Sequence, residues 1–166
     1  MRRDEREREG SAETPPTERA GPGGRPLHPV IAAVAIGAWV CSFGFDLVSR
    51  VADTAWVYER GAYVLTAIGV VVGVVAATAG FADLLRIPRA TRAFHVGVRH
   101  LVCMDSCLVL FTASLMIRRS SDFEWHAGVG VVPMGLSIAG LMVLGAGVRL
   151  GSRLTYTHGV RVASNR

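Results

Sequence analysis

Four long apolar segments alternate with polar ones along the chain. They cover residues 30–48, 62–85, 101–117 and 129–148, each close to the ~20 residues that a helix needs to cross ~30 Å of hydrocarbon. Strands do not fit, because an open sheet leaves main-chain groups unpaired in lipid and the segments lack the alternating polarity of barrel strands. The pattern therefore predicts an all-α integral membrane protein with four transmembrane helices.

Short connections and prolines refine this prediction. About a dozen residues join the first span to the second and the third to the fourth, which favours antiparallel neighbours and an up-down-up-down four-helix bundle. Pro29 falls in the first turn of the first span, where proline is tolerated, and Pro88 follows the end of the second. Pro133 is expected to kink the fourth span or to lie in its first turn.

Composition divides the chain into a membrane domain and two tails. Residues 1–26 are rich in mixed charge, proline and glycine, which predicts a disordered cytoplasmic tail. This polar lead is too long for a signal peptide, so we expect no cleavage. The four-helix transmembrane domain is expected over residues 27–162, and residues 163–166 form a short C-terminal tail.

The distribution of arginine predicts the orientation. The net charge is +5, but the arginines flank apolar segments, which indicates membrane contacts with the lipid bilayer and no nucleic-acid partner. The tail, the loop at residues 86–99 and the C-terminal end carry most of them and fall on one side. We expect a multi-pass inner-membrane protein with both termini in the cytoplasm.

Glycines four residues apart occur in two spans, as Gly69/Gly73 and Gly147/Gly151. Such spacing lets helices approach closely, either within one chain or between copies in a homo-oligomer. No detectable internal repeat or broken helix pair supports a transporter, and no common soluble-enzyme motif is present. The chain is therefore more readily understood as non-enzymatic.

Antiparallel threading brings several ionisable residues to the expected cytoplasmic face. Ionisable groups at membrane depth are expensive and often functional, so they form a candidate His/Asp cluster. Its expected members are His28, Asp83, His95, His100 and His158. Each also has a simpler interpretation, since His28 could cap a helix, His158 could be solvated beyond the last span, and Asp83 could pair with Arg86.

Soft metal ligands follow His100 along its helix. Cys103, Met104 and Cys107 lie three, four and seven residues later, on the same face. These atoms suit copper(I) or a haem iron, although such residues at this spacing also occur as ordinary core.

Two further carboxylates have separate expected roles. Asp105 lies in the third span and is expected to be sheltered by neighbouring helices in a buried seam. Asp46 is within reach of Arg50 four residues later and is expected to anchor the outer interface.

The chain resembles the bacterial predicted membrane proteins called domain of unknown function 2231, from residue 27 to about residue 162. The resemblance lies in the LHP opening, the FD dipeptide at Phe45-Asp46, GFADLLRIP, a His at the start of span three, and LGSRLTYTHGVRV. It implies a four-helix membrane fold without a settled activity, and some relatives are joined to Rieske-type iron–sulfur domains. Ala33 stands where many relatives have a second His, and Met104 departs from a common Asn.

Two functional hypotheses remain. The first is a non-enzymatic binding or scaffold module that uses the cytoplasmic-side His/Asp cluster. The second is a haem- or metal-binding protein accessory to electron transfer, with a redox partner protein. Its candidate haem ligands are His28, His100 and His158, and its alternative metal ligands are His100, Cys103, Met104 and Cys107.

Overall fold

The computed structural model describes residues 27–119 and 128–156. This part of the chain forms four helices and no strand: α2 (Leu27–Ser49), α3 (Ala55–Leu84), α4 (Arg92–Arg119) and α5 (Val131–Tyr156). All four are long and apolar enough to cross a membrane. The predicted all-α, four-span architecture is confirmed, whereas both predicted tails lie outside the described residues.

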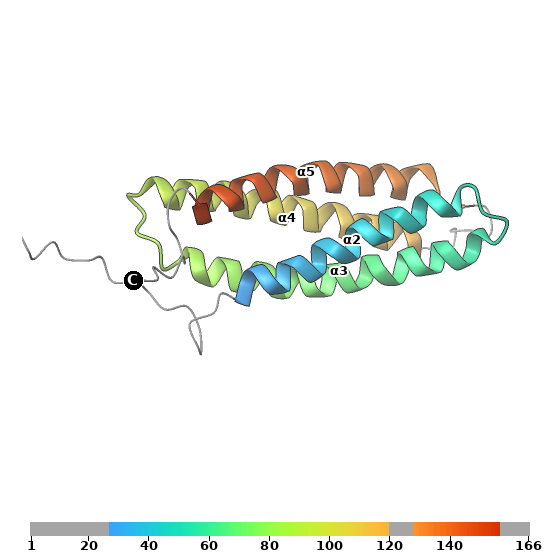
Figure 1. Cartoon of the computed structure of the whole chain (residues 1–166), viewed down its shortest axis with the longest axis horizontal. Coiled ribbons are helices and arrows are strands. Elements are labelled where there is room, and N and C mark those ends of the chain that lie inside the picture. The colour runs from blue at the N-terminus through green and yellow to red at the C-terminus, as the bar shows by residue number, and fades with distance from the viewer. Residues whose placement is uncertain (1–26, 120–127, 157–166) are drawn as a thin grey trace, which may run out of the picture.

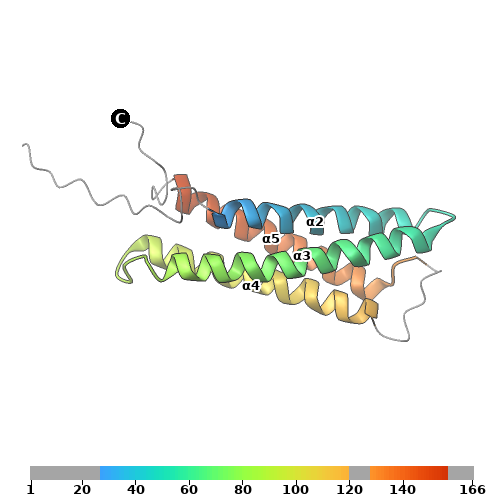
Figure 2. The same ribbon diagram turned by 90° about the horizontal axis from the view of Figure 1, so that it is seen from below.

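The helices form two antiparallel hairpins, α2–α3 and α4–α5, packed side by side (Figure 1). Helix α3 also packs along α4, and α2 approaches α5 more loosely. A view turned by 90° shows the same pairing (Figure 2). Successive helices run in opposite directions, as the short connections predicted, so α2 and α4 are parallel and lie diagonally across the bundle.

Helix ends follow local sequence signals. Thr91 precedes α4, and its Oγ1 accepts a hydrogen bond from the main-chain N–H of Phe94 (3.2 Å), which is an N-terminal cap. The cap explains why α4 begins at Arg92, nine residues before the expected apolar span. Pro29 and Pro133 both lie in the first turn of their helices, where the missing N–H has no helical partner.

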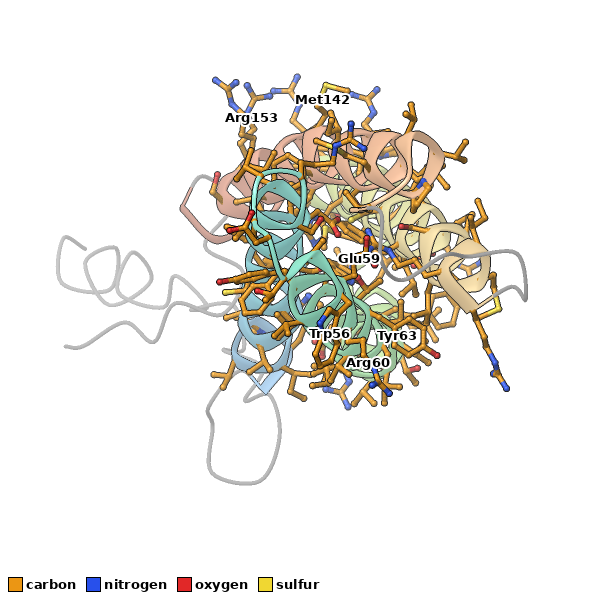
Figure 3. All side chains as sticks on the ribbon, turned by 90° about the vertical axis from the view of Figure 1, so that its right-hand side faces the viewer. Trp56, Glu59, Arg60, Tyr63, Met142 and Arg153 are labelled. Carbon is orange, nitrogen blue, oxygen red and sulfur yellow. The ribbon has the colours of Figure 1, made fainter. Side chains whose placement is uncertain are left out.

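An aromatic stack forms the centre of the core. The rings of Trp39 and Phe111 lie 4.6 Å apart and nearly parallel, at an interplanar angle of 3°. Ala35, Cys107 and Leu144 complete the buried cluster around them. Large apolar side chains cover the outside of the bundle, as at Met142 in Figure 3, which is the distribution expected of a surface that faces lipid.

The paired glycines pack within the chain. A Cβ on Gly69 would clash with the indole of Trp39, and one on Gly73 would lie 3.1 Å from its Cη2 atom. Likewise, a Cβ on Gly147 would lie 2.7 Å from Sδ of Met104. Of the two interpretations of this spacing, close packing between helices of one chain is therefore supported at both pairs.

Candidate functional site

Two histidines from different hairpins meet inside one end of the bundle. His28 lies in the first turn of α2 and His100 lies in the third turn of α4. Their ring centroids are 6.3 Å apart, with the ring planes at 88°. Both side chains are partly buried. The predicted convergence of these two histidines is therefore found.

Each imidazole is held by a main-chain carbonyl of the helix that follows it. Nδ1 of His28 lies 2.8 Å from the oxygen of Ala76 on α3, and Nδ1 of His100 lies 2.8 Å from the oxygen of Gly147 on α5. A carbonyl oxygen can only accept a hydrogen bond, so Nδ1 is the donor in both rings. In the neutral ring this tautomer places the lone pair on Nε2.

Glycines provide the space for both rings. A Cβ on Gly80 would lie 2.9 Å from Cε1 of His28, and a Cβ on Gly151 would lie 3.0 Å from Cε1 of His100. Each glycine follows the accepting carbonyl by four residues, which is one helical turn. The absent side chains let each ring reach the main chain of its neighbouring helix.

These similarities extend along both hairpins. In α2 and α4, residues at equivalent positions differ by 72 in number: His28/His100, Trp39/Phe111, Ser42/Ser114 and the oppositely charged pair Asp46/Arg118. In α3 and α5 the difference is 71, as for the accepting residues Ala76 and Gly147. The structure thus contains an internal repeat of a helical hairpin, which is not detectable in the sequence.

The serine positions illustrate the correspondence in detail. Oγ of Ser42 donates to the oxygen of Ala62 (2.9 Å), and Oγ of Ser114 donates to the oxygen of Pro133 (3.0 Å). Ser42 also contacts the hydroxyl of Thr66 at 2.7 Å. Few residues are identical between the halves, His28/His100 and Ser42/Ser114 among them, so sequence identity alone does not reveal the repeat.

The other members of the expected His/Asp cluster are placed differently. His95 is exposed, and its Nδ1 bonds to the oxygen of Thr91 in its own helix start. Asp83 pairs with Arg86 at 3.7 Å, the simpler of its two interpretations. His158 lies outside the described residues.

The alternative set of metal ligands does not assemble into a chelating group. Cys107 is fully buried in the aromatic core, whereas Cys103 and Met104 are half-buried and pack near Gly147. No group of three or more His, Cys, Asp or Glu side chains in residues 27–119 and 128–156 is arranged to hold a metal ion. Met104 and Cys103 both pack against Gly147, whose oxygen accepts the hydrogen bond of His100.

The expected roles of the two membrane aspartates were wrong. Asp105 is exposed, because α4 turns Met104, Cys107 and Phe111 inward and leaves position 105 on the outside. Asp46, the expected interface anchor of Arg50, is instead fully buried.

The partner of Asp46 is Arg118. Nη1 and Nη2 of Arg118 donate to the two carboxylate oxygens of Asp46 at 2.7 and 2.6 Å, and neither side chain is exposed. Arg50 donates to the oxygen of Val129. Sequence reasoning missed the pair because Arg118 stands at the end of an apolar span, where arginine ordinarily meets headgroups.

A second carboxylate lies near the same end of the bundle. Glu59, in the second turn of α3, is fully buried and directed between the helices, whereas Trp56, Arg60 and Tyr63 point outward (Figure 3). The sequence gives little sign of this burial, because Glu59 stands beside Arg60 just before the expected apolar span.

The model of one protein family, described as predicted membrane protein (DUF2231), matches residues 24–164. The chain belongs to the DUF2231 family. The resemblance seen in its sequence is thereby confirmed, and DUF2231 proteins are described as membrane proteins without an assigned activity. No curated protein and no solved structure matches this DUF2231 chain.

Proposed function

We propose that the protein binds one transition-metal centre through Nε2 of His28 and Nε2 of His100, either as the iron of a haem or as a bare metal ion. The observation that carries the proposal is the pair of Nδ1–carbonyl hydrogen bonds on two histidines from different hairpins whose rings lie side by side. Metal-bound histidines commonly donate the other ring N–H to a carbonyl, which fixes the tautomer and ring orientation.

The ring separation suits such a centre. Two metal–nitrogen bonds of about 2.0 Å, and about 1.2 Å from each ring centre to Nε2, would place the centroids about 6.4 Å apart. The centroids of His28 and His100 are 6.3 Å apart. This separation leaves room for one metal atom between the rings once both Nε2 atoms are directed at it.

The number of protein donors separates the two forms of the centre. A haem iron needs only two axial ligands from the protein, which the histidine pair supplies, and its porphyrin requires the hairpins to separate locally. A bare ion needs more donors, and the thioether of Met104, which packs beside Gly147, is a soft donor at this level of the bundle. Imidazole coordination is common to both forms.

The membrane side and the partner follow from the same proposal. The site lies at the arginine-rich end of the bundle, which we place at the cytoplasmic face of the inner membrane. A haem with both axial positions filled is suited to electron transfer, so the partner in that form is a redox protein.

The experiment is an absorption spectrum and a metal analysis of the purified full chain, after expression with haem, iron, copper and zinc supplied. A Soret band identifies haem, and stoichiometric metal without porphyrin identifies the ion. Variants His28→Gln and His100→Gln each keep an amide donor for the carbonyl but lack the imidazole nitrogen, so each should abolish the signal.

His95→Gln is the matched control. His95 is exposed and its Nδ1 bonds to the oxygen of Thr91 at the start of its own helix, so the variant should retain the full signal. A colourless, metal-free parent would refute the metal centre and leave the non-enzymatic binding or scaffold module. A signal that survives both histidine variants would refute the choice of ligands.

A further inference from the structure

The two hairpins meet through equivalent residues at three levels of the bundle. His28 lies beside His100, Trp39 stacks on Phe111, and Asp46 pairs with Arg118. In each of these three pairs the α4 residue is numbered 72 higher than its α2 partner, and the order along both helices is the same. An approximate two-fold axis therefore runs along the bundle between α2 and α4.

The histidine pair and the aromatic stack do not distinguish between pairing of unlike hairpins and pairing of two copies of one hairpin. Two copies of the first hairpin would bring His28 against a second His28 and Trp39 against a second Trp39. Two copies of the second would do the same with His100 and Phe111. Contacts of these kinds tolerate either arrangement, because imidazole pairs and stacked rings require no difference between partners.

The third level distinguishes the pairings. Self-pairing of the first hairpin would bury Asp46 against Asp46, and self-pairing of the second would bury Arg118 against Arg118. Both charges lie at sites that are fully buried here, where each is matched by a bidentate partner. Like charges buried together without a counter-ion are strongly unfavourable, and this repulsion is a recognised source of specificity.

We infer that the chain is a tandem duplication of a hairpin that once paired with itself, and that Asp46 and Arg118 determine which hairpin now pairs with which. The partner surface of α2–α3 is a hairpin that carries arginine at the position of Arg118. Within one chain the α4–α5 hairpin meets this requirement, and a second copy of the chain meets it only by exchanging the same hairpin. The inference does not depend on the metal centre.

Charge reversal in the full chain tests it. Asp46→Arg and Arg118→Asp each create a like-charged level, so the yield of folded monomer should fall about tenfold or more. The chain with both changes restores opposite charges and should recover to within about twofold of the parent. Asp53→Arg and Arg119→Asp reverse exposed charges at the same end of the bundle and should leave the yield unchanged.

Co-expression separates pairing specificity from a structural role. The Asp46→Arg chain carries arginine at both positions and the Arg118→Asp chain carries aspartate at both, so they can satisfy each other only by exchanging hairpins. Expressed together with different tags, they should co-purify as a folded heterodimer, at least about tenfold above the parent expressed with both tags.

A variant in which the ion pair is replaced by two apolar residues tests whether the charges prevent self-pairing. Replacing both residues, as Asp46→Leu with Arg118→Met, should preserve folding because a well-packed apolar pair can replace a buried ion pair. It should also raise co-purification of two tagged copies, since self-pairing is no longer opposed. Three results would each overturn the inference: no recovery in the doubly reversed chain, no co-purification of the two reversed chains, or an apolar chain as selective as the parent.

Discussion

Arg118, in the last turn of α4, donates two hydrogen bonds of 2.7 and 2.6 Å to the carboxylate of Asp46 in α2, and both side chains are fully buried. Nε of Arg118 also donates to the hydroxyl of Ser114 (3.3 Å). Hydrogen bonds thus fix the geometry of a charged pair inside a bundle whose outer surface is apolar. Such a pair is stable only when both members are present.

Removal of one charge from this pair should therefore be costly. Asp46→Asn leaves the guanidinium of Arg118 buried without its counter-ion, and we expect a loss of ~3–5 kcal/mol. Asp105→Asn is the control, because Asp105 is exposed, and should cost less than about 1 kcal/mol. Thermal unfolding in detergent measures both. Equal midpoints for the two variants would contradict the burial of the pair.

The contrast between Asp46 and Asp105 explains how far the sequence could lead. Hydropathy locates four spans because lipid requires long apolar helices, so the fold followed from the pattern alone. Which face of a helix turns inward depends on the packing of all four helices, so Asp105 was expected inside and Asp46 at the interface, whereas the structure has Asp105 exposed and Asp46 buried. Ser114, Arg118 and Phe111 share the inward face of α4, yet nothing in the chain marks that face as the buried one.

The candidate site was predictable in part for the same reason. Up-down topology places the start of α2 near the start of α4, which is why His28 and His100 were expected together. The packing of the two rings was not predictable, since the sequence does not show that Gly80 and Gly151 lie against them. The repeat is not evident in the sequence either, because the two halves share contacts and small residues more than residue identities.

The close packing of Gly80 and Gly151 against the two imidazoles leads to a second prediction. Gly80→Ala and Gly151→Ala each place a Cβ within about 3 Å of an imidazole carbon, so the ring must move or the helices must separate. We expect a loss of ~1–3 kcal/mol and a weakened metal or haem signal. Gly145→Ala, also in α5, has no atom within 4 Å of its new Cβ and is the control. A full metal or haem signal and unchanged thermal midpoints in Gly80→Ala and Gly151→Ala would show that these glycines are not needed to make room for the imidazoles.

The stack of Trp39 on Phe111 leads to a third prediction. Phe111 is fully buried against Trp39, and Gly140 leaves room for its ring, so Phe111→Ala should open a cavity and cost ~3–5 kcal/mol. Phe81→Ala removes a ring that is half exposed on α3 and should cost far less. Thermal midpoints of the two purified variants provide the comparison. A smaller loss at Phe111 than at Phe81 would show that the stack is not the centre of the core.

Membrane orientation is the remaining prediction, and the buried pair strengthens its basis. The connection between α3 and α4 and the end of α5 carry most of the arginines near the spans, whereas the opposite side has Arg50, Arg60, Arg118 and Arg119. Arg118 is neutralised by Asp46 inside the bundle, so it does not contribute as a free loop charge, and the asymmetry between the two sides increases. We expect the connection between α3 and α4, and with it the His28–His100 pair, on the cytoplasmic side.

Reporter fusions after Arg89, Arg119 and Arg166 measure this orientation directly. A cytoplasmic reporter should be active after Arg89 and Arg166, and a periplasmic reporter should be active only after Arg119. Exposed arginines set the orientation, so Arg118→Gln should leave the reporter pattern unchanged. The same variant should lower the amount of folded protein, because it leaves the carboxylate of Asp46 buried without its counter-ion. Periplasmic activity after Arg89 would reverse the topology and place the histidine pair at the outer face.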